Sequence, residues 1–495
     1  MTRRSLVASV GLAALYSGAR AAPAPFDAQT VPALARQLAS APYRPPQAAL
    51  PPFLAALDYD GYRMIRFKPD RALWRGSPSP FQLQMFHRGA LFREPIRLFE
   101  VQNGEALPIA YTPDLFSFGS TGETPVAEDL GFAGFRIHYP INTRAYFDEI
   151  ASFLGASYFR AVARNGVYGL SARGVSLGSG DPNEEFPAFR EFWIEHPGRG
   201  ANRIVVHALL DSQSVAGAYR FDIQPGEPTR IEVTARLYPR VRLENAGIAP
   251  LTSMYLFGPE QPRRFDDTRG EVHDSDGLLV ANGRGEHLWR PLANPPQVRQ
   301  SAFVDQAARG FGLMQRQRSL DVYGDFEARY DLRPSLWVEP LAGFGAGSVR
   351  LVELPAVHEG EDNIVASWRP AEPLEPGREH LFRYRLNWGA APAPADGRLT
   401  VAAWRTGRGD EPERRRFVID YYLGAGAQSQ GVEGDVTVSS GRILNLATSR
   451  SPLGDLFRLA FEVDRGGADA VELRASLVRA KRVISEVWTY RCPPN

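Results

Sequence analysis

Cysteine is almost absent from this chain of 495 residues, in which Cys492 carries the only thiol. A single cysteine excludes an intramolecular disulfide and a zinc site built from several cysteines. No histidine or aspartate stands beside Cys492 in a pattern typical of a catalytic thiol, so we assign it no role. We also find no ligand set typical of a metal site, and we expect no cofactor.

Lysine is scarce as well and occurs only at Lys68 and Lys481. Arginine supplies the remaining positive charge, and 57 basic residues against 56 acidic ones give a net charge of +1. A nearly neutral composition gives no sign of the basic surface with which proteins bind polyanions. We therefore expect no nucleic-acid partner.

Long hydrophobic runs are missing beyond the N-terminus, because no later segment reaches the roughly eighteen apolar residues that a spanning helix needs. The start of the chain has Arg3 and Arg4, an apolar run at residues 6–16, and small residues up to Ala22. This layout is typical of a secretory signal peptide over residues 1–22. The paired arginines suit the twin-arginine export route, although general secretory signals carry them too. We expect an exported protein without stable membrane insertion.

Motifs of several large enzyme classes are also missing. The chain has no phosphate-binding loop of the P-loop type and no His-Glu-x-x-His pattern, which carry nucleotide binding and zinc proteolysis. Strands do not alternate regularly with long helical segments, which argues against a parallel α/β sheet. Carboxylates are the natural candidates for chemistry in such a chain.

Glycine and proline, by contrast, are plentiful, with 46 and 40 residues, and they separate short segments that alternate between polar and apolar residues. Such runs are typical of half-buried antiparallel strands. Helices are expected at residues 32–40 and at residues 144–154, the second ending at Gly155. The fold is therefore predicted to be all-β, with strands that include residues 62–67, 81–86, 204–209, 219–223 and 231–237.

The length predicts two domains, since 495 residues exceed one ordinary core. Alanine, proline and glycine dominate residues 389–397, a composition typical of a linker. Residues 23–388 would then form a large β-sandwich. Residues 398–495, which contain the alternating segments 416–421 and 457–463, have the length and strand spacing of an immunoglobulin-like sandwich.

Two acidic clusters lie between the strand-like runs. Residues 271–277 read Glu-Val-His-Asp-Ser-Asp-Gly, and residues 359–363 read Glu-Gly-Glu-Asp-Asn. Both also suit ordinary turns, because aspartate side chains bond to nearby backbone amides and glycine tolerates positive φ. The first cluster lacks the remaining ligands of a calcium loop. From composition alone, a solvated turn is the better interpretation of each cluster.

These clusters stand among longer stretches that together resemble one protein family. The stretches are residues 153–161, 168–174, 184–194, 210–212, 247–254, 271–278, 333–335 and 362–366. In this order they resemble the MdoG/OpgG and OpgD family of periplasmic glucan biosynthesis proteins. The resemblance covers most of the chain after residue 22, and the paired arginines favour the OpgD branch.

The resemblance implies a periplasmic role in making osmoregulated glucans, polymers with a β-1,2-linked glucose backbone. It implies a large N-terminal β-sandwich of the galactose mutarotase-like kind, joined to a small immunoglobulin-like domain. Some members are inverting endo-β-1,2-glucanases, which is the activity we expect here. A transglycosylase and a non-catalytic glucan-binding or assembly protein remain alternatives. The expected partner is a β-1,2-linked glucan, and the oligomeric state stays open, with a homodimer as one option.

The resemblance also implies roles for five residues. Asp362 matches the general acid, and Asp274 matches the general base, with Asp276 as its rival in the same motif. Glu359 matches a supporting carboxylate. Tyr330 is expected to bind substrate or to relay a proton.

The chemistry of glycoside cleavage fits these roles. The bond breaks through an oxocarbenium-like transition state, so the leaving oxygen needs a proton and the anomeric carbon needs a nucleophile. Asp362 must hold a proton near neutral pH, which burial or the nearby Glu359 would favour. Asp274 must stay ionised and activate water, directly or through a chain of hydroxyls. Inversion requires the two carboxyls to lie roughly 6.5–9.5 Å apart, or further apart with a relay.

Overall fold

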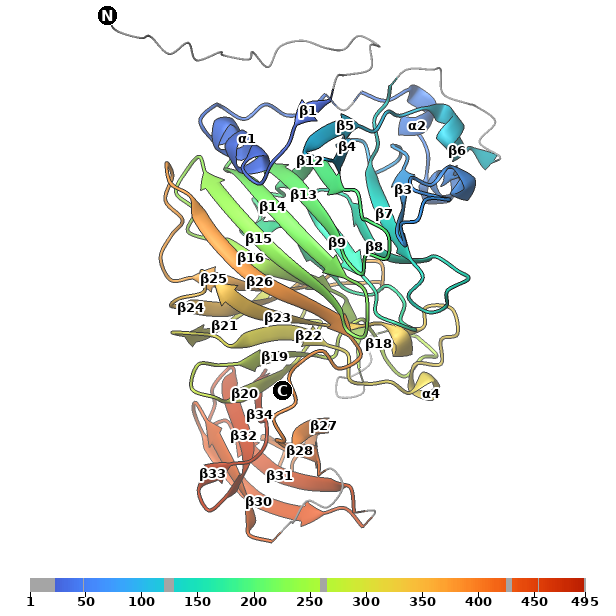
Figure 1. Cartoon of the computed structure of the whole chain (residues 1–495). Coiled ribbons are helices and arrows are strands. Elements are labelled where there is room, and N and C mark those ends of the chain that lie inside the picture. Colours follow the sequence, from blue (N-terminus) through green and yellow to red (C-terminus); the bar gives the residue numbers. More distant parts are fainter. Residues whose placement is uncertain are drawn as a thin grey trace, which may run out of the picture.

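The computed structural model describes residues 23–493 except 48, 120–128, 259–264, 424–429 and 453. Strands dominate and helices are few (Figure 1), which confirms the all-β prediction. The predicted signal peptide at residues 1–22 lies outside the described residues. Within the described part of the chain, no helix has the length and apolar character needed to span a bilayer.

The largest sheet among the described residues has sixteen strands. Adjacent strands are antiparallel except for two parallel pairs, β4 with β12 and β20 with β34. The order along the sheet is β1 (Ala24–Pro25), β5 (Glu105–Pro108), β4 (Arg97–Gln102), β12 (Ala188–Glu195), β13 (Ile204–Asp211), β14 (Val215–Gln224), β15 (Thr229–Pro239), β26 (His380–Gly389), β23 (Ser335–Ala342), β22 (Gly310–Met314), β19 (Gly277–Ala281), β20 (His287–Pro291), β34 (Val487–Cys492), β32 (Val471–Arg479) and β29 (Val432–Val438), with β33 (Arg482–Val483) beside β32.

The second large sheet has ten strands within the same described ranges. Its order is β21 (Arg299–Asp305), β24 (Gly347–Glu353), β25 (Ile364–Pro370), β16 (Ala246–Ser253), β10 (Ser171–Arg173), β9 (Tyr158–Ala161), β8 (Asp148–Leu154), β7 (Gly134–Tyr139) and β3 (Gln82–Phe86), with β11 (Val175–Leu177) beside β16. Smaller sheets pair β17 (Tyr255–Phe257) with β18 (Val272–His273), pair β2 (Arg66–Phe67) with β6 (Phe116–Ser117), and join β27 (Thr400–Arg408), β28 (Arg414–Tyr422), β31 (Leu456–Asp464) and β30 (Arg442–Arg450).

Short helices complete the described fold. They are α1 (Thr30–Ala39), α2 (Pro52–Ala55), α3 (Tyr59–Met64) and α4 (Leu320–Tyr323), together with the 3-10 turns η1 (Pro69–Arg71), η2 (Pro113–Leu115) and η4 (Tyr330–Leu332). Helix α1 lies against the outer side of β13, β14 and β15 (Figure 1). It corresponds to the helix predicted at residues 32–40.

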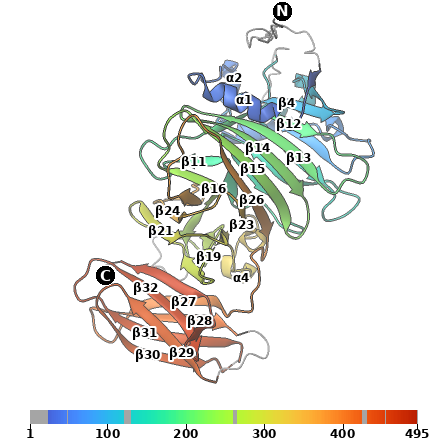
Figure 2. The same cartoon turned by 60° about the vertical axis from the view of Figure 1, so that its left-hand side comes forward.

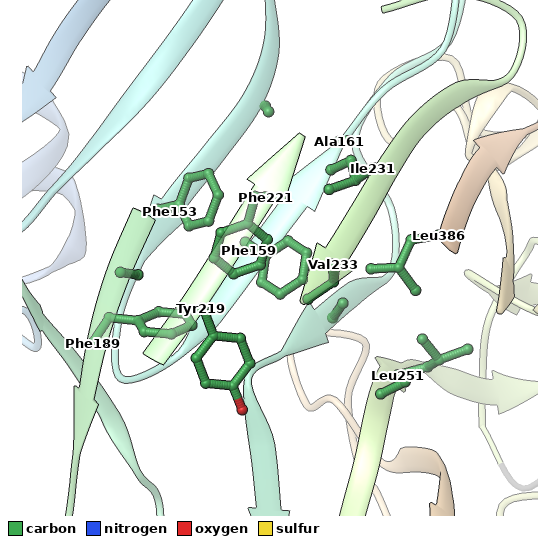
Figure 3. Packing of buried hydrophobic residues seen from close by; sticks show 14 of the residues in the cluster. Phe153, Phe159, Ala161, Phe189, Tyr219, Phe221, Ile231, Val233, Leu251 and Leu386 are labelled. Carbon is green, nitrogen blue, oxygen red and sulfur yellow. The ribbon is translucent and has the colours of Figure 1, made fainter. Parts of the chain in front are cut away.

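The two large sheets pack on each other through aromatic side chains. Phe153 of β8 and Phe159 of β9 contact Phe221 of β14, with ring centroids 5.2 and 5.1 Å apart (Figure 3). Ile231 and Val233 of β15 are buried in the same core. Burying apolar surface stabilises a fold by about 25 cal/mol per Å². The apolar side chains that the strands bury between the two sheets therefore hold the sheets together.

The strands predicted at residues 81–86, 204–209, 219–223 and 231–237 are confirmed as β3, β13, β14 and β15. The strand predicted at residues 62–67 is wrong over its first half, where α3 occupies residues 62–64, and only Arg66 and Phe67 form a strand, β2. The Asp58 carboxylate accepts a hydrogen bond from the Gly61 N–H at 2.8 Å and caps this helix. Capping of this kind stabilises the first helical turn and outweighs the alternating pattern.

The helix predicted at residues 144–154 is also wrong, since residues 148–154 form β8 between β7 and β9. A bulge opposite Ile137 and His138 shifts the register, and Ile150 and Ala151 are both buried. A β-bulge breaks the strict alternation of a strand. The sequence of β8 therefore lacks the alternating pattern that would have predicted a strand. Gly155, with φ +78°, closes the β8–β9 hairpin instead of ending a helix.

The C-terminal segment forms a two-layered β-sandwich at the lower end of the molecule (Figure 2). The sheet of β27, β28, β31 and β30 packs on β29, β32 and β34, and this core includes Phe417, Phe461 and Trp488. The predicted linker at residues 389–397 lies almost entirely between β26 and β27. The domain boundaries themselves stay a prediction.

Candidate functional site

Asp274 directly follows β18, the strand that pairs with β17. Its backbone N–H donates to the Met254 carbonyl at 2.8 Å, which continues the pairing and fixes the start of the loop. The side chain is buried, and the guanidinium of Arg333 donates to its Oδ1. A buried carboxylate needs such a partner.

Asp362 reaches the same place from a distant part of the sequence, because it immediately precedes Asn363 and β25. The Asn363 side chain accepts from the Tyr255 N–H at 2.8 Å and donates to the Tyr255 and Leu354 carbonyls at 2.9 and 3.1 Å. Met254 and Tyr255 therefore hold both segments, Asp274 through one residue and Asp362 through the next. The backbone at residues 254–255 sets the relative position of the two aspartates.

The two aspartates have different surroundings. Burial raises the pKa of Asp274, Arg333 opposes this rise, and the negative charge of Asp362 adds to it. The side chain of Asp362 is 37% exposed, and its Oδ2 lies 3.9 Å from Nη2 of Arg160. Two carboxyls with unlike environments are the arrangement from which acid and base roles arise. The expected burial of Asp362 is not found in this structure.

Tyr330 and Glu359 form a pair beside Asp274. The Tyr330 hydroxyl donates to Glu359 Oε2 at 2.7 Å, and Arg269 Nη1 donates to the same oxygen at 2.6 Å. Burial, reinforced by the bond to Glu359, raises the pKa of Tyr330, and Asp274 contributes as well. The phenol thus stays protonated and acts as a hydrogen-bond donor next to the aspartate.

The turn η4 aims both Tyr330 and Arg333 at this position. Arg329, at its start, has the left-handed φ of +47°, which is rare for a residue with a side chain. Arg333 lies with Cζ 4.2 Å from the Tyr330 ring centroid and donates to the Ala328 carbonyl as well as to Asp274. Figure 1 shows β18 next to α4, and Tyr330 packs with Val272 and Tyr323 of these elements.

Asp276, the rival of Asp274, has a different set of contacts. Its Oδ2 accepts the backbone N–H groups of Arg316 and Gln317 at 2.8 and 3.1 Å. Its own N–H donates to the Met314 carbonyl at 2.8 Å. Burial raises its pKa, and the charges of His273 and Arg316 oppose this rise. These contacts tie the loop to the end of β22, while Asp274 shares its surroundings with Asp362.

The structure therefore brings Asp274, Asp362, Tyr330 and Glu359 into one cluster and assigns Asp276 to its support. Sequence reasoning missed Arg333, Arg160 and Asn363 as members of this cluster. All three stand in stretches that carry the family resemblance. An arginine partner could have been expected from Asp274 alone, because a buried carboxylate needs a cation beside it.

Polar and aromatic groups extend the cluster along β9 and β10. Arg173 lies with Cζ 4.7 Å from the Tyr158 ring centroid and pairs with Glu184 at 2.8 Å. Burial raises the pKa of Tyr158, Arg173 lowers it, and the charge of Asp362 raises it further. Aromatic faces with charged hydrogen-bonding groups beside an acid suit a ligand that has both apolar faces and hydroxyls.

Two other kinds of site find no support. Residues 174–178 spell Gly-Val-Ser-Leu-Gly, the pattern of a serine nucleophile elbow, but Ser176 is buried within β11 and does not lie on a strand-to-helix turn. In the described ranges, no group of three or more His, Cys, Asp or Glu side chains is placed to hold a metal ion.

Comparison with known proteins gives consistent matches along the chain. A family described as "Periplasmic glucan biosynthesis protein, MdoG" matches residues 26–492. A "Glucans biosynthesis protein G" of Rhodopseudomonas palustris (strain BisA53) is 49% identical over 503 residues, 99% of each chain. Proteins of the same name in Vibrio cholerae and Bradyrhizobium diazoefficiens are 49% and 46% identical and cover 94% and 100% of this chain, and 86% and 100% of their own. Closeness to the OpgD branch stays a prediction.

Proposed function

Because the chain belongs to the MdoG family of periplasmic glucan biosynthesis proteins, we propose that it acts in the periplasm on a β-1,2-linked glucan backbone. The reaction would be inverting hydrolysis within the chain, an endo-β-1,2-glucanase activity. The observation that carries this proposal is the pairing of two aspartates in unlike environments. Asp274 is buried beside Arg333, and Asp362 is exposed beside Arg160.

The proposed general acid is Asp362. Its proton passes to the glycosidic oxygen while the bond between that oxygen and the anomeric carbon breaks. Its exposure leaves it accessible to the polymer, and a bound glucan would remove water from it and favour the neutral carboxyl. Arg160, at 3.9 Å, would stabilise the carboxylate that remains after the transfer.

The proposed general base is Asp274. Arg333 favours its ionised form against the effect of burial, so it can accept a proton from water. The oxygen of that water forms the new bond to the anomeric carbon on the face opposite the leaving group. If the water does not touch the aspartate directly, the Tyr330 hydroxyl would take the proton from the water and pass its own proton, which Glu359 accepts in this structure, to Asp274. Glu359 and Arg269 orient that hydroxyl.

Product analysis tests the proposal. Purified protein is incubated with linear β-1,2-glucan, next to Asp274→Asn and Asp362→Asn variants. Short linear oligosaccharides with an inverted anomeric configuration, read by NMR at early times, are expected from the parent. Each variant should lose about 10²–10⁴-fold in rate, the usual contribution of a general acid or base. Longer or cyclic products would indicate transfer instead, and saturable binding without products would indicate a non-catalytic role.

A further inference from the structure

A concavity lies where β20 and β21 meet the C-terminal strands β29, β32 and β34. Its volume is about 560 Å³, within the range of about 300–1,000 Å³ typical of small-molecule sites. None of the residues that line it belongs to the carboxylate cluster. The cavity is therefore a separate feature of the molecule.

Hydroxyl and amide groups make up much of its wall. The lining includes Ser301, Thr437, Ser439, Thr489 and Gln300. The Ser439 Oγ accepts the Glu472 N–H at 2.9 Å, and the Thr489 hydroxyl donates to the Trp289 carbonyl at 3.3 Å. Each hydroxyl both donates and accepts, so these side chains suit a ligand with many hydroxyls.

The charges on the wall are already balanced. Nη1 of Arg290 donates to Glu472 Oε2 at 3.2 Å, and Arg474 pairs with Glu286. Each guanidinium thus has a carboxylate beside it. An anion entering the cavity would meet Glu472 as well as the arginines, so the charge pattern favours a neutral ligand.

Arg290 also carries two hydrogen-bond donors that are not used. Its side chain is 3% exposed, and Nε and Nη2 have no hydrogen-bond partner among the described residues. Both nitrogens lie on the same edge of the guanidinium. Buried donors normally have an acceptor, but both nitrogens are buried, so a ligand oxygen reaches them only if the Arg290 side chain shifts toward the adjoining cavity.

We infer that this cavity is a second carbohydrate site, which holds a short stretch of neutral glucan away from the carboxylate cluster. The identity of the sugar rests on the proposed function. Glu472, whose side chain is 58% exposed, accepts from hydroxyls, and the exposed Gln300 and Thr437 in the same lining exchange hydrogen bonds with them. Such a site would hold the polymer while another part of it is cleaved.

The test measures binding stoichiometry by isothermal titration calorimetry, with linear β-1,2-linked glucose oligomers as the probe. The full-length chain carries Asp362→Asn in every sample, so that the probe is not consumed. Thr437→Trp fills the cavity from an exposed position on β29. Asp435→Trp is its matched control, because Asp435 lies two residues earlier on the same strand face and outside the lining. Equal thermal midpoints establish that both variants fold.

The Thr437→Trp protein should bind one equivalent of oligomer fewer than the Asp435→Trp protein. Gln300→Ala, on the β21 side of the cavity, removes one hydrogen bond and should raise the Kd of the oligomer bound there by about 2- to 10-fold. Equal stoichiometry in the two tryptophan variants would overturn the inference, as would preferential binding of citrate or phosphate. If the protein without substitutions does not cleave the glucan, the proposed hydrolysis is wrong. The second site still stands if Thr437→Trp removes one equivalent of bound oligomer.

Discussion

Arg333 connects the two groups on which proton transfer in the proposed reaction depends. It donates to Asp274 and lies over the ring of Tyr330, with Cζ 4.2 Å from the centroid. Burial alone would favour the neutral form of Asp274, and the nearby guanidinium opposes that effect. One side chain thus adjusts the charge of the proposed base and the position of the proposed relay.

Replacing this arginine should change the pH dependence of activity. In Arg333→Gln, Asp274 loses the positive charge that lowers its pKa, so its pKa rises. The base works only when ionised, and the acidic limb of the kcat/KM profile should therefore move to higher pH. Arg329→Gln removes an arginine from the same turn that pairs with Asp331 instead, and its limb should stay in place. Superimposable profiles for both variants would contradict the role given to Arg333.

At the scale of the element, Asn363 clips the segment that carries Asp362 to β17, next to the backbone that holds Asp274. In Asn363→Ala the Tyr255 N–H, the Tyr255 carbonyl and the Leu354 carbonyl lose this partner. Each buried group left unpaired costs about 1–3 kcal/mol, so the free energy of unfolding in urea should fall markedly. Asn142→Ala serves as control, because it removes hydrogen bonds to Asp148 and Asn165 at an exposed position, where water replaces them, and should cost much less. Equal stability of the two variants would show that the clip does not hold the segments.

Close packing of β19 on β20 gives a second prediction at this scale. A Cβ on Gly277 would lie 2.1 Å from Cζ2 of Trp289, whose ring supports Arg316 at 3.6 Å from Cζ to the centroid. Gly277→Ala must displace that ring, and overpacking of this kind costs about 1–3 kcal/mol. Gly345→Ala, with nothing within 4 Å of its Cβ, should leave the thermal midpoint unchanged. A midpoint for Gly277→Ala equal to that of Gly345→Ala would contradict this packing argument.

How far the sequence predicts these elements depends on how regular they are. Strand β15 buries every second residue over most of its length and β14 does so from Tyr219 onward, whereas β8 contains a bulge and was predicted as a helix. The aspartates of the site were found through resemblance to a family. Their arginine partners were not, because nearly all of the 57 basic residues are arginine and Arg333 stands 59 residues from Asp274. Composition therefore does not indicate which of these arginines pairs with Asp274.

At the scale of the whole molecule, the C-terminal segment shares its core with the body. Trp289, Met314 and Trp337 pack in one cluster with Trp404 and Trp488 from beyond the predicted linker. Strand β34 also extends the largest sheet by pairing with β20. A sheet and a core that cross the predicted boundary favour cooperative unfolding of both parts.

The contact between Arg316 and Glu486 tests this coupling, because it joins the C-terminal segment to the loop after Asp274. Arg316 donates to Glu486 at 2.6 and 2.8 Å, and its backbone N–H is held by Asp276. Removing one partner of a fully buried pair costs about 3–5 kcal/mol, and the cost is lower here since Arg316 is 24% exposed.

Glu486→Gln should therefore lower the thermal midpoint of a single calorimetric transition. It should also reduce turnover of glucan, since the loop that carries Asp274 loses an anchor. Glu411→Gln breaks an exposed pair with Arg414 in the same segment and should change stability by about 0–1 kcal/mol at most. Two separate transitions in the parent would show that the parts unfold independently. In that case the shared sheet would not couple them, and Glu486→Gln would affect the C-terminal transition alone.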